Sequence, residues 1–176
     1  MQAFVPAEKV SSHNVFFVDK KKNVIIDGNF IKILYSNEYM ELNGLCISFK
    51  PFIPTNTPHT DSSARRGIMV TPNTKSTNAK YLIEFHPYHF ENSAIINRLC
   101  YLERAIVEQY VSTHAPNKTA VFNLRNQLMA GSIKIQSANE PNVSALSPAN
   151  YALKISGVWE TNTSVGITVK FITVVY

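Results

Sequence analysis

The chain has 176 residues, of which 17 are Lys or Arg and 12 are Asp or Glu, so its formal net charge at pH 7 is +5. This length is enough for one well-buried domain, and no change in composition separates a second one from residues 1–176. Charged residues make up only 16% of the chain, below the usual share of about a quarter, which disfavours long solvent-exposed helices. The basic balance indicates an acidic partner, although many basic proteins bind no nucleic acid.

The cysteines and the N-terminus indicate where the protein works. Cys46 and Cys100 are too few and too far apart for a disulfide framework, so we expect free thiols in a reducing compartment. Residues 1–10 lack the basic segment and apolar run of a signal peptide. No run approaches the roughly eighteen apolar residues of a membrane span. The expectation is a soluble, intracellular protein without a membrane partner.

The first fifty residues read as a β-meander. A short apolar run at 15–18 is followed by three lysines at 20–22. Asp27-Gly28 lies between the β-branched run 24–26 and the alternating run 30–35, which predicts a hairpin with both runs as strands. A second turn at 41–44 leads into a strand at 45–49.

The segment 51–80 is dominated by Pro, Thr, Asn and Ser. It is too long for a simple connection, and loops of this length are usually either functional or disordered; both readings stay open. Within it we expect one short strand at 68–70. A further strand is predicted at 81–85.

One helix is predicted over about residues 93–113, with Asn92 or Ser93 as its N-cap. Its apolar residues recur every three or four positions and form one face that should pack on a sheet; they are Ile95, Leu99, Leu102, Ile106 and Tyr110. Charged residues that include Glu103 are expected on the remaining, exposed surface.

The last third of the chain returns to strand-like patterns. Residues 121–125 and 132–136 predict two strands, or a helix and a strand, around Gly131, and 138–150 is a second polar loop. The C-terminal 26 residues from Tyr151 read as two alternating strands joined by a polar turn. The predicted fold is α+β and mostly β: an OB-like barrel or an interrupted antiparallel sheet with one flanking amphipathic helix.

The residues that catalysis requires are sparse. The sequence contains no Gly-x-Ser-x-Gly elbow and no Gly-rich phosphate loop before a helix. The only aspartates are Asp19, Asp27 and Asp61, and each occupies a predicted turn or loop. His86 and His89 would need two further ligands to hold zinc, so ordinary surface histidines are the simpler reading. We expect no enzyme activity, no metal and no cofactor.

Cations instead alternate with aromatic rings along the predicted strands. Because side chains alternate across a strand, Lys32, Lys154 and Lys170 should point away from their apolar neighbours and toward solvent. Lysines 20–22 and 75 could extend such a track through loops. A basic, aromatic surface suits a polyanion whose bases can stack, meaning single-stranded nucleic acid. The candidate binding residues from this pattern are Lys32, Tyr35, Lys50, Phe52, Arg65, Arg66, Lys80, Tyr81, Lys154, Trp159, Lys170 and Phe171.

Several strings support the same reading through a family resemblance: Asp27-Gly-Asn-Phe-Ile-Lys-Ile-Leu-Tyr-Ser36, Asn123-Leu-Arg-Asn-Gln-Leu-Met-Ala-Gly-Ser-Ile-Lys134, Leu153-Lys-Ile-Ser-Gly-Val-Trp-Glu160 and Val165-Gly-Ile-Thr-Val-Lys-Phe171. With these strings the chain resembles the single-stranded DNA-binding proteins of large eukaryotic DNA viruses, particularly those of insect viruses. The resemblance implies an OB-like barrel that coats unwound DNA during viral replication, in the host nucleus or at a viral replication site.

The resemblance also implies roles for particular residues. Lys154, Trp159, Lys170 and Phe171 would lie near the bound strand, with Arg125 and Lys134 adding charge. Many single-strand binders end in an acidic tail that recruits partners, whereas this chain ends in an apolar strand. Partner recruitment then works differently here, or the chain is truncated.

The sequence leaves the partners and one rival function open. Self-association along DNA and contacts with replication proteins are expected, and RNA in place of DNA is not excluded. The alternative is a non-catalytic virion or structural protein, a β-sandwich whose Asn-, Ser- and Thr-rich loops are simply its exterior.

Overall fold

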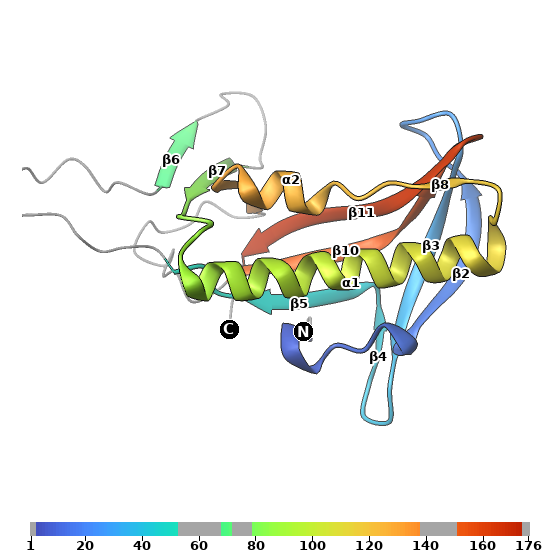
Figure 1. Cartoon of the computed structure of the whole chain (residues 1–176), viewed down its shortest axis with the longest axis horizontal. Coiled ribbons are helices and arrows are strands. Elements are labelled where there is room, and N and C mark those ends of the chain that lie inside the picture. The colour runs from blue at the N-terminus through green and yellow to red at the C-terminus, as the bar shows by residue number, and fades with distance from the viewer. Residues whose placement is uncertain (1–2, 53–67, 72–78, 138–150, 174–176) are drawn as a thin grey trace, which may run out of the picture.

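A single hydrogen-bonded sheet organises the part of the chain that the computed structural model describes, which is residues 3–52, 68–71, 79–137 and 151–173. The long helix α1 (Phe90–His114) lies across one face of this sheet, and the shorter α2 (Leu124–Met129) lies beside it (Figure 1). The predicted α+β fold with mostly β-structure is therefore confirmed.

The main path through the sheet runs in the order β1, β5, β10, β11, β9, β7, β6, and β3 joins β2 and β4 to it by pairing with β10. Two short 3-10 helices, η1 (Ala7–Lys9) and η2 (Ser12–Asn14), precede β2. The strands are β1 (Val5–Pro6), β2 (Val15–Lys22), β3 (Asn29–Ser36), β4 (Glu41–Asn43), β5 (Leu45–Phe49), β6 (Ile68–Thr71), β7 (Ala79–Glu84), β8 (Thr119–Ala120), β9 (Ser132–Ser137), β10 (Tyr151–Glu160) and β11 (Ser164–Thr173).

The sheet is mixed rather than purely antiparallel. β1 pairs with β5 in parallel, and β11 pairs in parallel with both β8 and β9. The β9–β11 pairing is parallel because β10, which lies between them in sequence, takes its place on the far side of β11. The short strand predicted at 68–70 is present as β6. Most of the predicted loops 51–80 and 138–150 lies outside the described residues.

β10 is a central strand, and successive parts of one of its edges pair with two different strands. Tyr151–Ile155 pairs with β5, and Gly157–Glu160 pairs with β3. The change occurs at a bulge between Ile155 and Gly157, where the pairing with β11 also shifts register. A bulge bends its strand and increases the local twist, so the sheet curves around α1.

The predicted strand at residues 24–26 is wrong. β2 continues through the lysines to Lys22, and the apolar run forms the tip of the β2–β3 hairpin instead. The side chain of Asn23 fixes this tip, because its Oδ1 accepts the backbone N–H groups of Ile25 at 2.9 Å and Ile26 at 3.4 Å. An Asn side chain that bonds its own backbone favours a turn over a strand.

The start of α1 also differs from its prediction. The helix begins at Phe90 with His89 as N-cap, and Asn92 lies buried within the first turn. The Asn92 side chain bonds the backbone of Phe52 in both directions, accepting from its N–H at 2.6 Å and donating to its carbonyl at 2.9 Å. Asn92 therefore ties the end of the β5 segment to the helix rather than capping it.

Glu103, expected on the exposed side of the helix, is buried. Its carboxylate accepts the backbone N–H groups of Asn123 and Leu124, at 2.9 and 3.1 Å, and so caps the N-terminus of α2 from the neighbouring helix. Residues 124–129 consequently form a helix, which settles the choice that the sequence left open between a helix and a strand.

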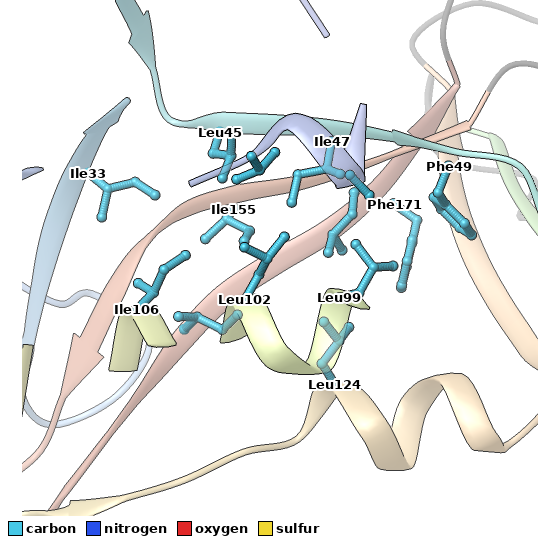
Figure 2. Close-up of a cluster of buried hydrophobic side chains, with 14 of the residues drawn as sticks. Ile33, Leu45, Ile47, Phe49, Leu99, Leu102, Ile106, Leu124, Ile155 and Phe171 are labelled. Atoms are coloured by element: carbon cyan, nitrogen blue, oxygen red, sulfur yellow. The ribbon is translucent and has the colours of Figure 1, made fainter. Parts of the chain in front are cut away.

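The core lies between α1 and the inner face of the sheet, the face that α1 covers. Leu99, Leu102 and Ile106 point from the helix toward residues of β3, β5 and β10, including Ile33, Leu45 and Ile155 (Figure 2). Each of these side chains is at most 1% exposed. Burying one such side chain contributes about 1.5–3 kcal/mol, so this layer stabilises the packing of α1 on the sheet. None of the described helices is both long and apolar enough to cross a membrane.

Candidate nucleic-acid interface

Strand register defines a second, outer face of the sheet, on the side away from α1. Lys154 of β10 lies directly opposite Lys170 of β11, and on the other side Lys32 of β3 lies opposite Gly157 of β10. Their sequence neighbours Leu153, Ile155 and Ile33 are fully buried on the inner face. By the alternation of a β-strand, the three lysines share the outer face of adjacent strands.

Two aromatic rings of this outer face lie against glycines of a neighbouring strand. Trp159 pairs with Gly166, and a Cβ there would lie 2.4 Å from the indole ring. Phe30 lies against Gly157 in the same way, since a Cβ there would come within 2.6 Å of the phenyl ring. The indole N–H donates to the carbonyl of Ile167 at 3.1 Å, and this hydrogen bond fixes the Trp159 ring against β11. Both rings are half-buried, with one surface against the backbone.

Among the described residues, no acid forms an ion pair with Lys32, Lys154 or Lys170. Ion pairs between described residues join Lys20 and Lys118 to Glu160 and Arg104 to Glu108, and involve none of the outer-face lysines. No outer-face position on β3, β10 or β11 in the described strands is Asp or Glu. Like charges directly opposite one another destabilise a sheet, so the Lys154–Lys170 pair costs the folded protein stability.

Two more lysines continue the outer face at its ends. Lys134 of β9 is exposed between the buried Ile133 and Ile135, and Ile135 pairs with the buried Phe171, so Lys134 and Lys170 share a face. These two lysines also line one cavity of about 480 Å3 between α2, β9 and β11. At the opposite end Lys21 of β2 pairs with Phe30.

The outer face is not open along its whole length. Ala152 of β10 and Cys46 of β5 occupy outer positions and are buried. The accessible part of the face therefore begins at Lys154 and Lys170 and runs toward Lys32, Trp159 and the β2–β3 hairpin. From here on, "outer face" means this accessible part, formed by Lys21, Phe30, Lys32, Lys134, Lys154, Trp159, Thr168 and Lys170.

Several predicted site residues lie elsewhere. Tyr35 is fully buried and Phe171 is 7% exposed, so both rings belong to the core and cannot stack on a base. Strand alternation already indicated this, because each is on the face opposite the nearest lysine. Phe52 stacks on His89 at 3.9 Å near the start of α1. Arg125 lies on α2, where its guanidinium donates to Asn97 of α1 at 3.3 Å, on the helical side of the molecule.

The remaining predicted residues are only partly described. Lys50 is exposed one residue beyond β5. Arg65 and Arg66 lie outside the described residues, and for Lys80 and Tyr81 the structure describes only the backbone in β7. The sequence reasoning missed Phe30 as a candidate, although a ring two residues before Lys32 on one strand must share its face.

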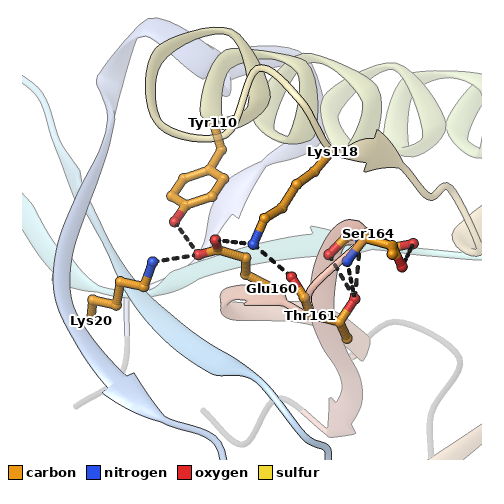
Figure 3. A network of polar contacts seen from close by, with 7 residues as sticks. Lys20, Tyr110, Lys118, Glu160, Thr161 and Ser164 are labelled. Carbon is orange, nitrogen blue, oxygen red and sulfur yellow. Dashed lines mark hydrogen bonds and ion pairs between the residues drawn. The ribbon is translucent and has the colours of Figure 1, made fainter.

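On the inner face, by contrast, a buried charge has partners within the chain. Glu160, 4% exposed at the end of β10, accepts hydrogen bonds from Lys20 at 2.8 Å, from Tyr110 at 2.9 Å and from Lys118 (Figure 3). Burial alone would raise the pKa of this carboxyl, but the three hydrogen bonds outweigh it and hold the pKa at about 2. Burial, together with the bond to Glu160 and its charge, raises the pKa of Tyr110. Through Glu160, this cluster connects β2, β10, α1 and the segment before β8.

The histidine pair shows no metal-binding arrangement. His89 is packed against Phe52, and His86 points its ring toward Tyr88. Among the residues that the structure describes, no three His, Cys, Asp or Glu side chains come together as a metal site.

The outer face thus brings together several lysines that form no ion pair with a described residue and two aromatic rings on adjacent strands. Comparison with family models, with curated proteins and with solved structures finds no match for this chain.

Proposed function

We propose that the outer face binds single-stranded DNA without sequence preference and holds it open, as a non-catalytic protein of viral DNA replication. The observation that carries this proposal is that the cross-strand pair Lys154–Lys170 shares a face with the ring of Trp159, with the pair Gly157–Thr168 between them. A bound phosphate would relieve the repulsion between the two ammonium groups, and a base could stack on the free surface of the indole.

The expected energies are sufficient for useful affinity. Stacking one base on an aromatic ring contributes about 1–3 kcal/mol and does not depend on which base is present. Each phosphate neutralised on a single strand adds about −0.7 to the slope of log K against log salt. With Lys32, Lys134, Lys154 and Lys170 engaged, that slope should be about −3.

The shape of the sheet fits the proposal as well. OB-folds bind single strands on the surface of a curved, mostly antiparallel sheet, with loops at its edge closing over the strand. We propose an OB-like role for the curved sheet of β3, β10 and β11. Copies of the chain would associate side by side along DNA, and RNA is a second candidate ligand because bases and phosphates are common to both.

The single tryptophan of the chain makes the test direct. Oligothymidine should quench Trp159 fluorescence, with affinity that falls steeply between low and high salt, while duplex DNA of equal length should bind weakly. The matched control is Tyr101→Trp in a Trp159→Phe background, which moves the reporter to an exposed position on α1. Quenching at position 101 as strong as at 159 would contradict binding at the outer face. A protein that ignores oligothymidine at low salt and forms stable oligomers alone would favour the structural alternative.

A further inference from the structure

The tip of the β2–β3 hairpin exposes two large aliphatic side chains. Val24 is 97% exposed and Ile25 is 89% exposed, more than any other large hydrophobic residue that the structure describes. Hydrophobic burial contributes about 25 cal/mol per Å2, so a protein gains by covering such a pair. In this hairpin the pair instead projects into solvent.

The loop conformation holds these side chains outward. Besides the two bonds from Ile25 and Ile26 to the Asn23 side chain, the Asn23 N–H donates to the carbonyl of Gly28 at 2.9 Å and closes the loop. Gly28 in turn lies tightly against the β10–β11 turn, where a Cβ would be 2.1 Å from the carbonyl oxygen of Glu160. The tip therefore cannot fold back onto the sheet without breaking these contacts.

The charges below the tip connect it to the outer face. Lys20 is held by Glu160 on the inner side. Lys21 is opposite Phe30, which is itself opposite Trp159, so Lys21 lies at the end of the row of rings. Lys22 is exposed, and neither Lys21 nor Lys22 has an ion pair with a described residue. A strand lying along the outer face would reach the apolar tip at this end.

The next hairpin shows that this turn geometry does not require aliphatic residues. In the β3–β4 turn, Asn37 accepts the N–H groups of Tyr39 at 2.9 Å and Met40 at 3.0 Å, in the same pattern as Asn23. That turn is flanked by Glu38 and Glu41 rather than by lysines. It lies at the other end of β3 (Figure 1). The β2–β3 turn, which also contains Asp27, thus combines exposed aliphatic residues with preceding lysines, and the β3–β4 turn does not.

We propose that the β2–β3 tip is a wedge that opens base pairs where bound single strand joins duplex. Val24 and Ile25 would enter between the terminal base pair and its neighbour, while Lys21 and Lys22 contact phosphates. Aliphatic wedges of this kind unstack base steps in other DNA complexes, at a cost of about a few kcal/mol per step. The inference rests on the proposed function and adds an activity to it. Continuity with the outer face favours DNA over an anionic lipid surface.

The test uses a fork, a duplex with one oligothymidine arm, that carries 2-aminopurine in the terminal base pair. The native protein should raise the 2-aminopurine fluorescence at saturation. Val24→Ser/Ile25→Ser should bind plain oligothymidine within about twofold of the native chain but lose about tenfold of the preference for the fork, equivalent to 1.4 kcal/mol. Tyr39→Ser is the matched control, because Tyr39 is 82% exposed on the other Asn-fixed turn, and it should behave like the native chain.

The outcomes separate the two proposals. Failure of the native chain to bind oligothymidine overturns the proposed function itself. Binding without fork opening, or opening that Val24→Ser/Ile25→Ser leaves unchanged, overturns the wedge alone. Co-sedimentation with phosphatidylserine vesicles that this variant abolishes, together with unaltered fork opening, would assign the tip to a membrane surface instead. Thermal melting of the variant checks its fold, which substitutions at solvent-exposed positions should leave intact.

Discussion

The two faces of β10 differ in how they accommodate charge. On the inner face one carboxylate, Glu160, has two ammonium partners and a hydroxyl donor. On the outer face Lys154 and Lys170 stand opposite each other, and no outer-face position in the described parts of β3, β10 and β11 is Asp or Glu. The inner face satisfies its charge within the chain, while the outer face leaves charge to be satisfied by something else.

This difference separates stability from binding along a single strand. Substitutions on the inner face should lower the free energy of unfolding, because they remove buried contacts or leave a buried charge unpaired. Substitutions of the outer-face lysines should lower affinity for a polyanion and change stability little. Four variants test this separation, in decreasing order of their expected effect on the free energy of unfolding.

Leu102→Ala should have the largest effect. Leu102 is fully buried between α1 and the sheet, and a Leu to Ala change of this kind costs about 2–5 kcal/mol through lost burial and the cavity that remains. Urea denaturation followed by circular dichroism measures it. Tyr101→Ala, at the preceding helix position and 58% exposed, should cost less than 1 kcal/mol by comparison. Equal losses in the two variants would show that α1 does not pack as described.

Glu160→Gln should cost about 3 kcal/mol near neutral pH, because the carboxyl pKa of about 2 in the folded state lies below its ordinary 4.5. A lowered pKa contributes stability that is complete above about pH 4.5 and is lost as the pH falls toward 2. The native chain should therefore lose stability across that window, whereas Glu160→Gln should show a flatter acid limb. Glu108→Gln, at an exposed ion pair with Arg104, is the control and should change stability by about 0.5 kcal/mol or less. An acid limb that is the same in Glu160→Gln and the native chain would contradict the network.

The sequence predicted the outward direction of the outer-face lysines but not that they share a surface. The two-residue period of a strand sets which side chains point away from Leu153 and Ile155. Whether Lys32 and Lys154 point to the same side depends on strand order and on the bulge between Ile155 and Gly157, which only the folded pairing determines. A one-residue change of register would have placed Lys32 on the helical side.

Other features depended on contacts between distant segments. Glu103 is buried because α2 needs an acceptor at its N-terminus, and Lys118 reaches Glu160 across 42 residues. No local pattern encodes such pairs. The apolar run at 24–26 misled the strand prediction because β-branched residues are enriched in strands. Here Asn23 gave the competing signal, a turn-forming side chain immediately before the run.

Gly166→Ala should have an intermediate effect on the free energy of unfolding, and the fluorescence of Trp159 should report it. The new Cβ would overlap the indole of Trp159, so the ring must leave the sheet, and overpacking of this kind costs about 1–3 kcal/mol. The emission of the single tryptophan should shift to the red as the ring becomes hydrated, and quenching by oligothymidine should weaken. Thr168→Ala, two residues away on the same face of β11, should leave the emission unchanged. An unshifted emission in Gly166→Ala would mean that the ring does not lie on Gly166.

Lys154→Gln/Lys170→Gln should have the smallest effect on stability, with the opposite sign. Removing the facing charges should raise the free energy of unfolding by about 0.2–1 kcal/mol, because like charges directly opposite each other repel. The same change should weaken oligothymidine binding and make the slope of log K against log salt shallower by about 1.4, which is two phosphates at about 0.7 each. Lys9→Gln/Arg104→Gln removes the same number of charges from exposed positions on η1 and α1 and should change neither quantity comparably. If both double variants reduced the salt slope equally, affinity would follow net charge alone, and the distinction between the two faces would lose its functional meaning.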